Sequence, residues 1–214
     1  MHILLKNLLL ESAVTDNPNF KKWFKDSKVV DKQGNPLPVY HGTGAEFSSF
    51  KKKNLSAGGS HYLDIGIHFA ETSDTAGTYA MAAVYDDRYR RGYSQGGKPG
   101  NPMVYPVYLS GQNPLYIDRD SGIPERLFLR MKQEANLSDR TKAVILYKVD
   151  PILIFQDYQR KLGKDKLQKL LLSEKYDSVN YRFQGTNWIV FEPTQIKSIF
   201  NNGEFDSNNP DISK

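Results

Sequence analysis

The stretch "GIHFAETSDTAGTYA", residues 66–80, decides the class of fold. Its first five residues form a short apolar run, which predicts a buried strand over 66–70. The residues that follow predict a helix over about 73–84, because Thr72 or Ser73 can accept a hydrogen bond from its first turn. A strand followed directly by a helix indicates a domain that contains both kinds of element.

His68 is the unusual residue of this stretch, because it places a titratable ring in the middle of the expected strand. One interpretation is a core histidine that packs between Ile67 and Phe69. The other is a ring that meets a ligand. The stretch alone does not choose between them.

The rest of the chain continues the mixture of strands and helices. We expect an α+β class with strands in the majority. Asn17 and Pro18 open a helix whose aromatic residues Phe20, Trp23 and Phe24 share one face. Further strands are expected at 39–43, 45–50, 103–111, 114–118, 177–183, 187–192 and 194–200, and further helices at 123–136 and 150–176, the latter broken at Gly163; residues 141–149 fit a strand or a buried helix.

No internal repeat or long linker divides the chain, so we expect a helical segment over 1–27 and one domain over 28–214. The 214 residues contain no cysteine, which excludes disulfides, thiolate metal sites and cysteine nucleophiles. No run reaches the roughly 18 apolar residues that span a bilayer. The net charge of +5 is compatible with an anionic ligand or partner without requiring one.

Three separated motifs contain the candidate site residues. "VYHGT", residues 39–43, ends a strand in His41 and Gly42, and glycine permits close approach of a ligand to the backbone. The 66–80 stretch places Tyr79 eleven positions after His68. "GTNWIVFEPTQIKS", residues 185–198, opens an apolar strand with the polar Asn187.

In order and spacing, these motifs resemble the ADP-ribosyltransferase superfamily, on the branch of diphtheria-like toxins and poly(ADP-ribose) polymerases. That family has His-Gly on its first strand, Gly-Ile-Tyr-Phe-Ala with a tyrosine eleven residues later, and Glu-Tyr-Ile-Val-Tyr-Asp followed by Gln-Val or Gln-Ile. The end of the chain, from Val190 to Ile212, also resembles transferase modules of phage and mobile-element polyvalent proteins. The resemblance implies a split β-sheet fold with peripheral helices and NAD+ as a substrate, without a metal.

The resemblance also implies a role for each matching residue. His41 would bond the adenosine ribose, and Gly42 would hold the nicotinamide amide through its backbone, with Thr43 beside them. His68 and Tyr79 would flank the nicotinamide ring. Phe69 lies in the same motif and is expected at the cofactor. A protonated His68 would oppose the positive pyridinium, so we expect the neutral ring to bind.

Asn187 departs from the family, which has a catalytic glutamate at this position. That glutamate binds a ribose hydroxyl, and its charge stabilises the oxocarbenium-like state as nicotinamide leaves. Strand alternation places Glu192 on the opposite face, so it does not substitute. Three explanations stay open: an active enzyme with another carboxylate such as Asp64, a protein that binds NAD+ without turnover, or an inactivating substitution.

We therefore expect a mono-ADP-ribosyltransferase with His41, His68 and Asn187 at the catalytic centre, or a degenerate module that binds NAD+ or a partner. Mono-transfer is preferred because chain elongation requires the missing glutamate. The acceptor is a protein or a nucleic acid, and the Arg- and Tyr-rich loop 86–102 is a candidate grip for it. A cytoplasmic protein is expected, with delivery into a bacterial host by a phage as an option.

Overall fold

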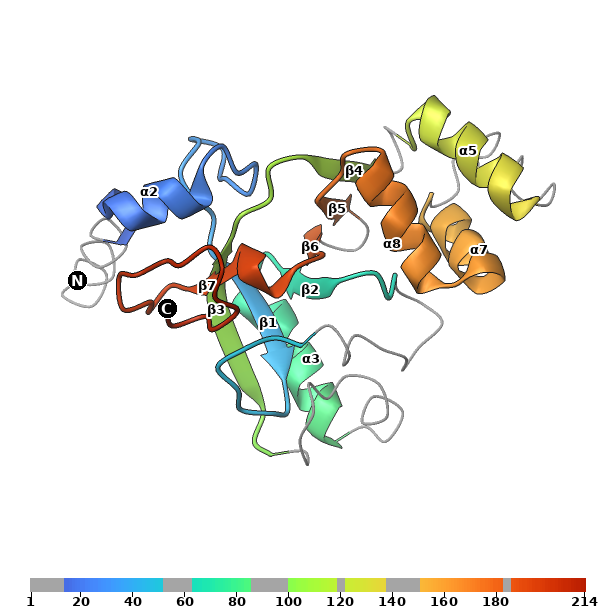
Figure 1. Ribbon diagram of the computed structural model, residues 1–214. Helices are drawn as coiled ribbons and strands as arrows, with labels where there is room; N and C mark the ends of the chain where they lie inside the picture. Colours follow the sequence, from blue (N-terminus) through green and yellow to red (C-terminus); the bar gives the residue numbers. More distant parts are fainter. Residues whose placement is uncertain (1–13, 52–62, 86–99, 119–121, 138–150, 183–185) are drawn as a thin grey trace.

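The structure is a computed structural model that describes residues 14–51, 63–85, 100–118, 122–137, 151–182 and 186–214. Its described part mixes strands and helices along the chain (Figure 1). The helices are α2 (Pro18–Phe24), α3 (Ser73–Tyr85), α5 (Glu125–Ala135), α7 (Ile152–Leu162), α8 (Lys164–Ser173) and the 3-10 helix η2 (Pro193–Gln195); the strands are β1 (Val39–Thr43), β2 (Ile67–Ala70), β3 (Met103–Leu109), β4 (Pro114–Asp118), β5 (Ser178–Arg182), β6 (Thr186–Val190) and β7 (Ile196–Ser198).

The seven strands form one sheet in the order β4-β5-β6-β2-β1-β3-β7. Only β4 and β5 are parallel, and the other neighbours are antiparallel. The junction between β2 and β1 is different from the rest, because Tyr40 and Ala70 are its single residue pair. The sheet is therefore split into a half with β4, β5, β6 and β2 and a half with β1, β3 and β7.

Helices cover the two halves separately. Apolar residues of α5, α7 and α8 share a buried cluster with β4 and β5, and these helices lie together at one end of the molecule (Figure 1). Helix α3 packs instead against β1, the strand at the edge of the split. Gly163, with φ +89°, ends α7 and lets α8 start in a new direction, as the glycine break predicted.

Helix α2 lies at the other end of the molecule and begins as the sequence predicts. The Asn17 side chain accepts a bond from Asn19 N at 2.8 Å, and Pro18 follows at the first helical position. Its aromatic face is buried, with Phe20 in edge contact with Tyr108 of β3 and with Phe205 near the C-terminus. The boundary expected between 1–27 and 28–214 stays a prediction, and residues 1–13 lie outside the described part.

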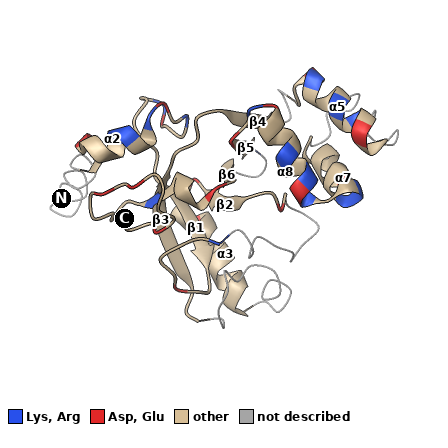
Figure 2. Cartoon of the chain, viewed as in Figure 1, with Lys and Arg blue, Asp and Glu red and all other residues tan. Residues whose placement is uncertain are grey.

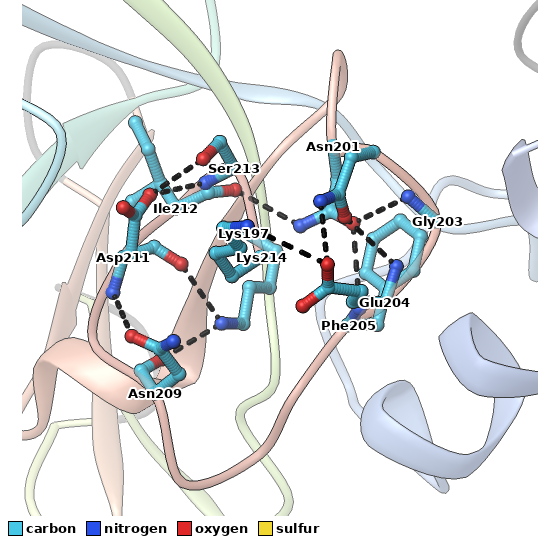
Figure 3. Close-up of polar contacts among 11 residues, drawn as sticks. Lys197, Asn201, Gly203, Glu204, Phe205, Asn209, Asp211, Ile212, Ser213 and Lys214 are labelled. Carbon is cyan, nitrogen blue, oxygen red and sulfur yellow. Dashed lines mark hydrogen bonds and ion pairs between the residues drawn. The ribbon is translucent and has the colours of Figure 1, made fainter.

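The C-terminal segment 199–214 folds back on β7 through a buried lysine (Figure 3). Lys197 is fully buried, and its Nζ donates to the carbonyls of Asn209 at 2.8 Å and Asp211 at 3.0 Å. Burial lowers the pKa of Lys197, and nearby acidic side chains oppose that shift. The turn-rich end of the chain is thereby fastened to the sheet.

The α+β class and the split sheet are confirmed, with every strand expected outside 45–50 present to within about two residues at each end. The strand expected over 45–50 is wrong. That segment makes one bridge, from Ser49 to Asp211, because the edge of β1 is already occupied by β3. Residues 141–149 lie outside the described part. No helix within the described ranges is long and apolar enough to cross a membrane.

Candidate active site

A cleft opens where the sheet is split. It contains about 430 Å³ of space not filled by atoms, a volume that includes solvent at its open side. Its walls come from both halves of the sheet and from helix α3. The lining residues are Tyr40, His41, Gly42, His68, Phe69, Ala70, Tyr79 and Asn187. All three sequence motifs therefore meet at one place, although 146 positions separate His41 from Asn187.

His41 bridges the split with its side chain. Its Nδ1 lies 2.8 Å from the backbone carbonyl of His68, so Nδ1 carries the proton and Nε2 is an acceptor. The ring packs edge-on against Phe50 and lies near Phe69, with centroid separations of 5.0 and 5.6 Å. Burial lowers the pKa of His41 from 6.5 to about 4, so the imidazole is neutral at pH 7. Nε2 is buried and has no hydrogen-bond partner among the described residues.

His68 is both anchored by a hydrogen bond and placed on the cleft wall. Its Nε2 lies 2.7 Å from the Leu63 carbonyl and therefore donates to it. Burial lowers the pKa of His68, and the bond to Leu63 only partly opposes this. The ring is half-buried and lines the cleft. A ring held in this way presents a fixed, neutral plane.

Tyr79 reaches the cleft from helix α3. The helix is capped by Thr72, whose Oγ1 accepts from Thr75 N at 3.2 Å. Ala76 and Ala80 are buried on the face that meets β1, and the half-buried Tyr79 beside them lines the cleft. Small residues on this face let the helix backbone approach the strand closely, and that approach sets the position of the tyrosine.

Gly42, expected from the sequence to permit close approach of a ligand, is also required by the packing of α3 on β1. A Cβ at Gly42 would lie 1.8 Å from the carbonyl oxygen of Ala76 and 2.8 Å from Ala80 N. Both atoms belong to the backbone of α3, so no side chain can rotate away. The glycine therefore lets the helix sit on β1, and it also lines the cleft.

Asn187 faces the cleft opposite Ala70, its register partner on β2. Glu192, five residues later, does not line the cleft; it begins η2, where its N–H donates to Gln195 Oε1 at 2.9 Å. With both histidines neutral, none of the lining residues is charged at pH 7. Figure 2 shows Lys, Arg, Asp and Glu concentrated on α2, α5, α7 and α8, with the ribbons of β1 and α3 almost free of them.

The sequence over residues 31–205 matches a family described as "ADP-Ribosyltransferase in polyvalent proteins". The match spans most of the chain. This protein belongs to that family. None of the curated proteins matches the sequence. Among solved structures, the chain is similar to one described as "Crystal structure of an anti-CRISPR protein", with 15% identity, a TM-score of 0.38, and coverage of 75% of this chain and 91% of that one.

Within this ADP-ribosyltransferase family member, Thr43 is the expected site residue that does not line the cleft. It is fully buried, and its Oγ1 accepts from Ala45 N at 3.2 Å, which closes the turn after β1. Two lining residues, Tyr40 and Ala70, were not expected from the sequence. These two residues reach the cleft because they form the single residue pair across the split.

Two further expectations about the transferase concern regions outside the cleft. Asp64 does not line it, and its backbone N–H donates to Gln159 Oε1 of α7 at 3.0 Å. Burial raises the pKa of the Asp64 carboxyl, and Lys164 opposes this shift. The proposed acceptor loop falls mostly on residues 86–99, outside the described part. Tyr105 beside it stacks on Phe47 and accepts a bond from Phe47 N at 2.9 Å. Across the described ranges, no group of acidic or histidine side chains could hold a metal.

Proposed function

We propose that this chain is an NAD+-dependent mono-ADP-ribosyltransferase that modifies a macromolecular acceptor. The observation that carries the proposal is the convergence of His41, His68, Tyr79 and Asn187 on one uncharged cleft at the split of the sheet. Membership of the ADP-ribosyltransferase family supports NAD+ as the ligand class. In this function the cleft holds the nicotinamide end of NAD+ between the two halves of the sheet.

His41 would hold the sugar end of the ligand through the nitrogen that the protein leaves without a partner. Because Nδ1 is committed to the His68 carbonyl, Nε2 can accept a bond from a ribose hydroxyl. A buried acceptor that lacks a partner costs about 1–3 kcal/mol, so a ligand hydroxyl that reaches it is favoured. Gly42 would contribute backbone groups to the nicotinamide amide.

His68 and Tyr79 would flank the nicotinamide ring. The stacking of planar rings contributes about 1 kcal/mol beyond burial. The neutral state of His68 matters, because a cationic ring in this place would repel the pyridinium of NAD+. Asn187 would bond a hydroxyl of the nicotinamide ribose without supplying the charge of a glutamate.

The test combines NAD+ binding by calorimetry with nicotinamide release measured by chromatography. The informative variant is His41→Asn, since an asparagine amide can replace Nδ1 toward the His68 carbonyl while Nε2 disappears. We expect NAD+ to bind about 3–10-fold more weakly to this variant, the loss of one hydrogen bond. Unaltered affinity in a folded His41→Asn protein, or no binding of NAD+ to the wild type, would contradict the proposal.

A second candidate function is binding of NAD+ or a partner without turnover, and the amide at position 187 favours it. The variant Asn187→Glu distinguishes the two candidates. In a degenerate module the restored carboxylate should create nicotinamide release from a silent protein, and in an active enzyme it should raise an existing rate. Loss of a transition-state charge contact changes rates by about 10²–10³-fold, so the two outcomes are separable.

The acceptor is proposed as a protein or a nucleic acid. Incubation of a lysate with labelled NAD+, followed by protease or nuclease, assigns the labelled product to one class. If loop 86–102 holds a nucleic acid, labelling should fall steeply with added salt, as it does wherever phosphates are neutralised by Arg and Lys. A cytoplasmic location, with delivery by a phage particle, remains part of this proposal.

A further inference from the structure

Tyr40 lines the cleft and has no role in the function proposed above. The residue is half-buried, and no hydrogen bond joins its hydroxyl to another residue in the described ranges. Within the same ranges, the side-chain amide of Asn187 also lacks a protein partner. A phenol both donates and accepts, and an amide offers one acceptor oxygen and two N–H donors. Two polar groups that the protein leaves uncommitted therefore line one cleft.

The register of the sheet puts these two side chains on either side of Ala70. Tyr40 is the partner of Ala70 on β1, and Asn187 is its partner on β6. Directly opposed residues of neighbouring strands point to the same face of a sheet, and all three residues line the cleft. Adjacent strands lie about 4.8 Å apart, so about 10 Å separates the backbones at 40 and 187. The small methyl group of Ala70 lies between them and leaves the space above it open.

Helix α3 bounds this space on the side of β1. Gly42 lies two residues after Tyr40, so both residues lie on the same face of that strand. A Cβ at Gly42 would lie 1.8 Å from Ala76 O, which shows that α3 covers this face beside Tyr40. Tyr79 lines the cleft from the same helix. The ring expected to stack on nicotinamide therefore comes from the segment next to Tyr40, and the sugar attached to that nicotinamide would lie close to the phenol.

We propose that Tyr40 binds the nicotinamide ribose of NAD+, an inference that rests on the proposed function. The Tyr40 hydroxyl hydrogen-bonds one ribose hydroxyl, and the Asn187 amide bonds the other. The pair holds the sugar from two sides, above the methyl group of Ala70. Because both groups are neutral, they orient the sugar without adding charge to the cleft. The cleft thereby selects a nicotinamide that carries a ribose over free nicotinamide.

The experiment measures the affinities of three probes for the full chain: NAD+, nicotinamide riboside and free nicotinamide. Tyr40→Phe removes the hydroxyl and keeps the ring. Tyr116→Phe is the matched control, because Tyr116 is a half-exposed strand tyrosine that does not line the cleft. We expect Tyr40→Phe to bind NAD+ and the riboside about 3–10-fold more weakly, the loss of one hydrogen bond, and to bind nicotinamide as wild type does. Tyr116→Phe should bind all three probes as wild type does.

The probes separate failure of this inference from failure of the proposed function. Equal affinity of wild type and Tyr40→Phe for NAD+ overturns the inference alone. An equal loss for the riboside and for nicotinamide also overturns it, because such a loss comes from the ring site or from packing. A loss for NAD+ without a loss for the riboside places the hydroxyl at another part of the dinucleotide, and the inference fails. A wild-type protein that binds none of the probes overturns the proposed function, and the inference with it.

Discussion

Replacement of Gly42 by alanine should push helix α3 away from strand β1. The added Cβ would lie 1.8 Å from Ala76 O and 2.7 Å from Ala76 C, whereas ordinary contacts begin at 3.4 Å. Relief of the clash requires α3 to move from β1 by at least about 1.5 Å, because close-packed backbone cannot yield otherwise. We expect a loss of about 3 kcal/mol or more, at the upper end of overpacking costs.

The assay is thermal unfolding together with NAD+ binding. A loss of that size lowers the melting temperature by roughly 6–12 °C in a chain of this length. Displacement of α3 also moves Tyr79, so NAD+ affinity should fall in whatever fraction stays folded. Gly77→Ala is the matched control on the same helix, because its Cβ meets nothing within 4 Å. That change should stabilise the protein by about 0.5–1 kcal/mol. A Gly42→Ala protein as stable as wild type would refute the packing argument.

Two further predictions concern pH and the C-terminal segment. The folded pKa of His41 is about 4 against 6.5 when unfolded, so the folded state favours the neutral ring. This contribution, up to about 3 kcal/mol, is complete above pH 6.5 and is lost as the pH falls toward 4. Burial also lowers the pKa of His68, so urea unfolding should show this slope in wild type and a smaller slope in His41→Asn. Lys197→Met should cost about 2–4 kcal/mol, because the carbonyls of Asn209 and Asp211 lose a buried donor. Lys214→Met, which removes an exposed pair at 3.6 Å, should cost less than about 1 kcal/mol in the same melts.

The sequence predicts local features of this protein well, because they depend on neighbours in the chain. The cap at Asn17, the break at Gly163 and the strand around His68 follow from backbone chemistry and apolar periodicity. The match of three motifs then predicted the split sheet. Residues that act through contacts distant in sequence were harder to predict. Position 42 must be a glycine because the backbone of Ala76 lies against it, and Tyr40 meets Ala70 only after the sheet has formed.

The search for a replacement carboxylate illustrates the same limit from the side of function. Asp64, the substitute carboxylate suggested by its proximity to the motif in sequence, lies instead against α7.

The single pair between β1 and β2 also explains why β1 carries a histidine at its centre, directly after Tyr40. Two strands that part after one pair leave backbone groups without a ladder partner, and a buried carbonyl in that state is costly. His41 Nδ1 donates to the carbonyl of His68 and so replaces a missing ladder bond with a side chain. The same bond fixes the tautomer that leaves Nε2 as an acceptor in the interior. Both His41→Ala and His41→Asn should weaken ligand binding and lose the ring's packing on Phe50, but only His41→Asn keeps a donor for the His68 carbonyl. His41→Ala should therefore melt at the lower temperature, and equal melting temperatures for the two variants would show that the bond does not hold the split together.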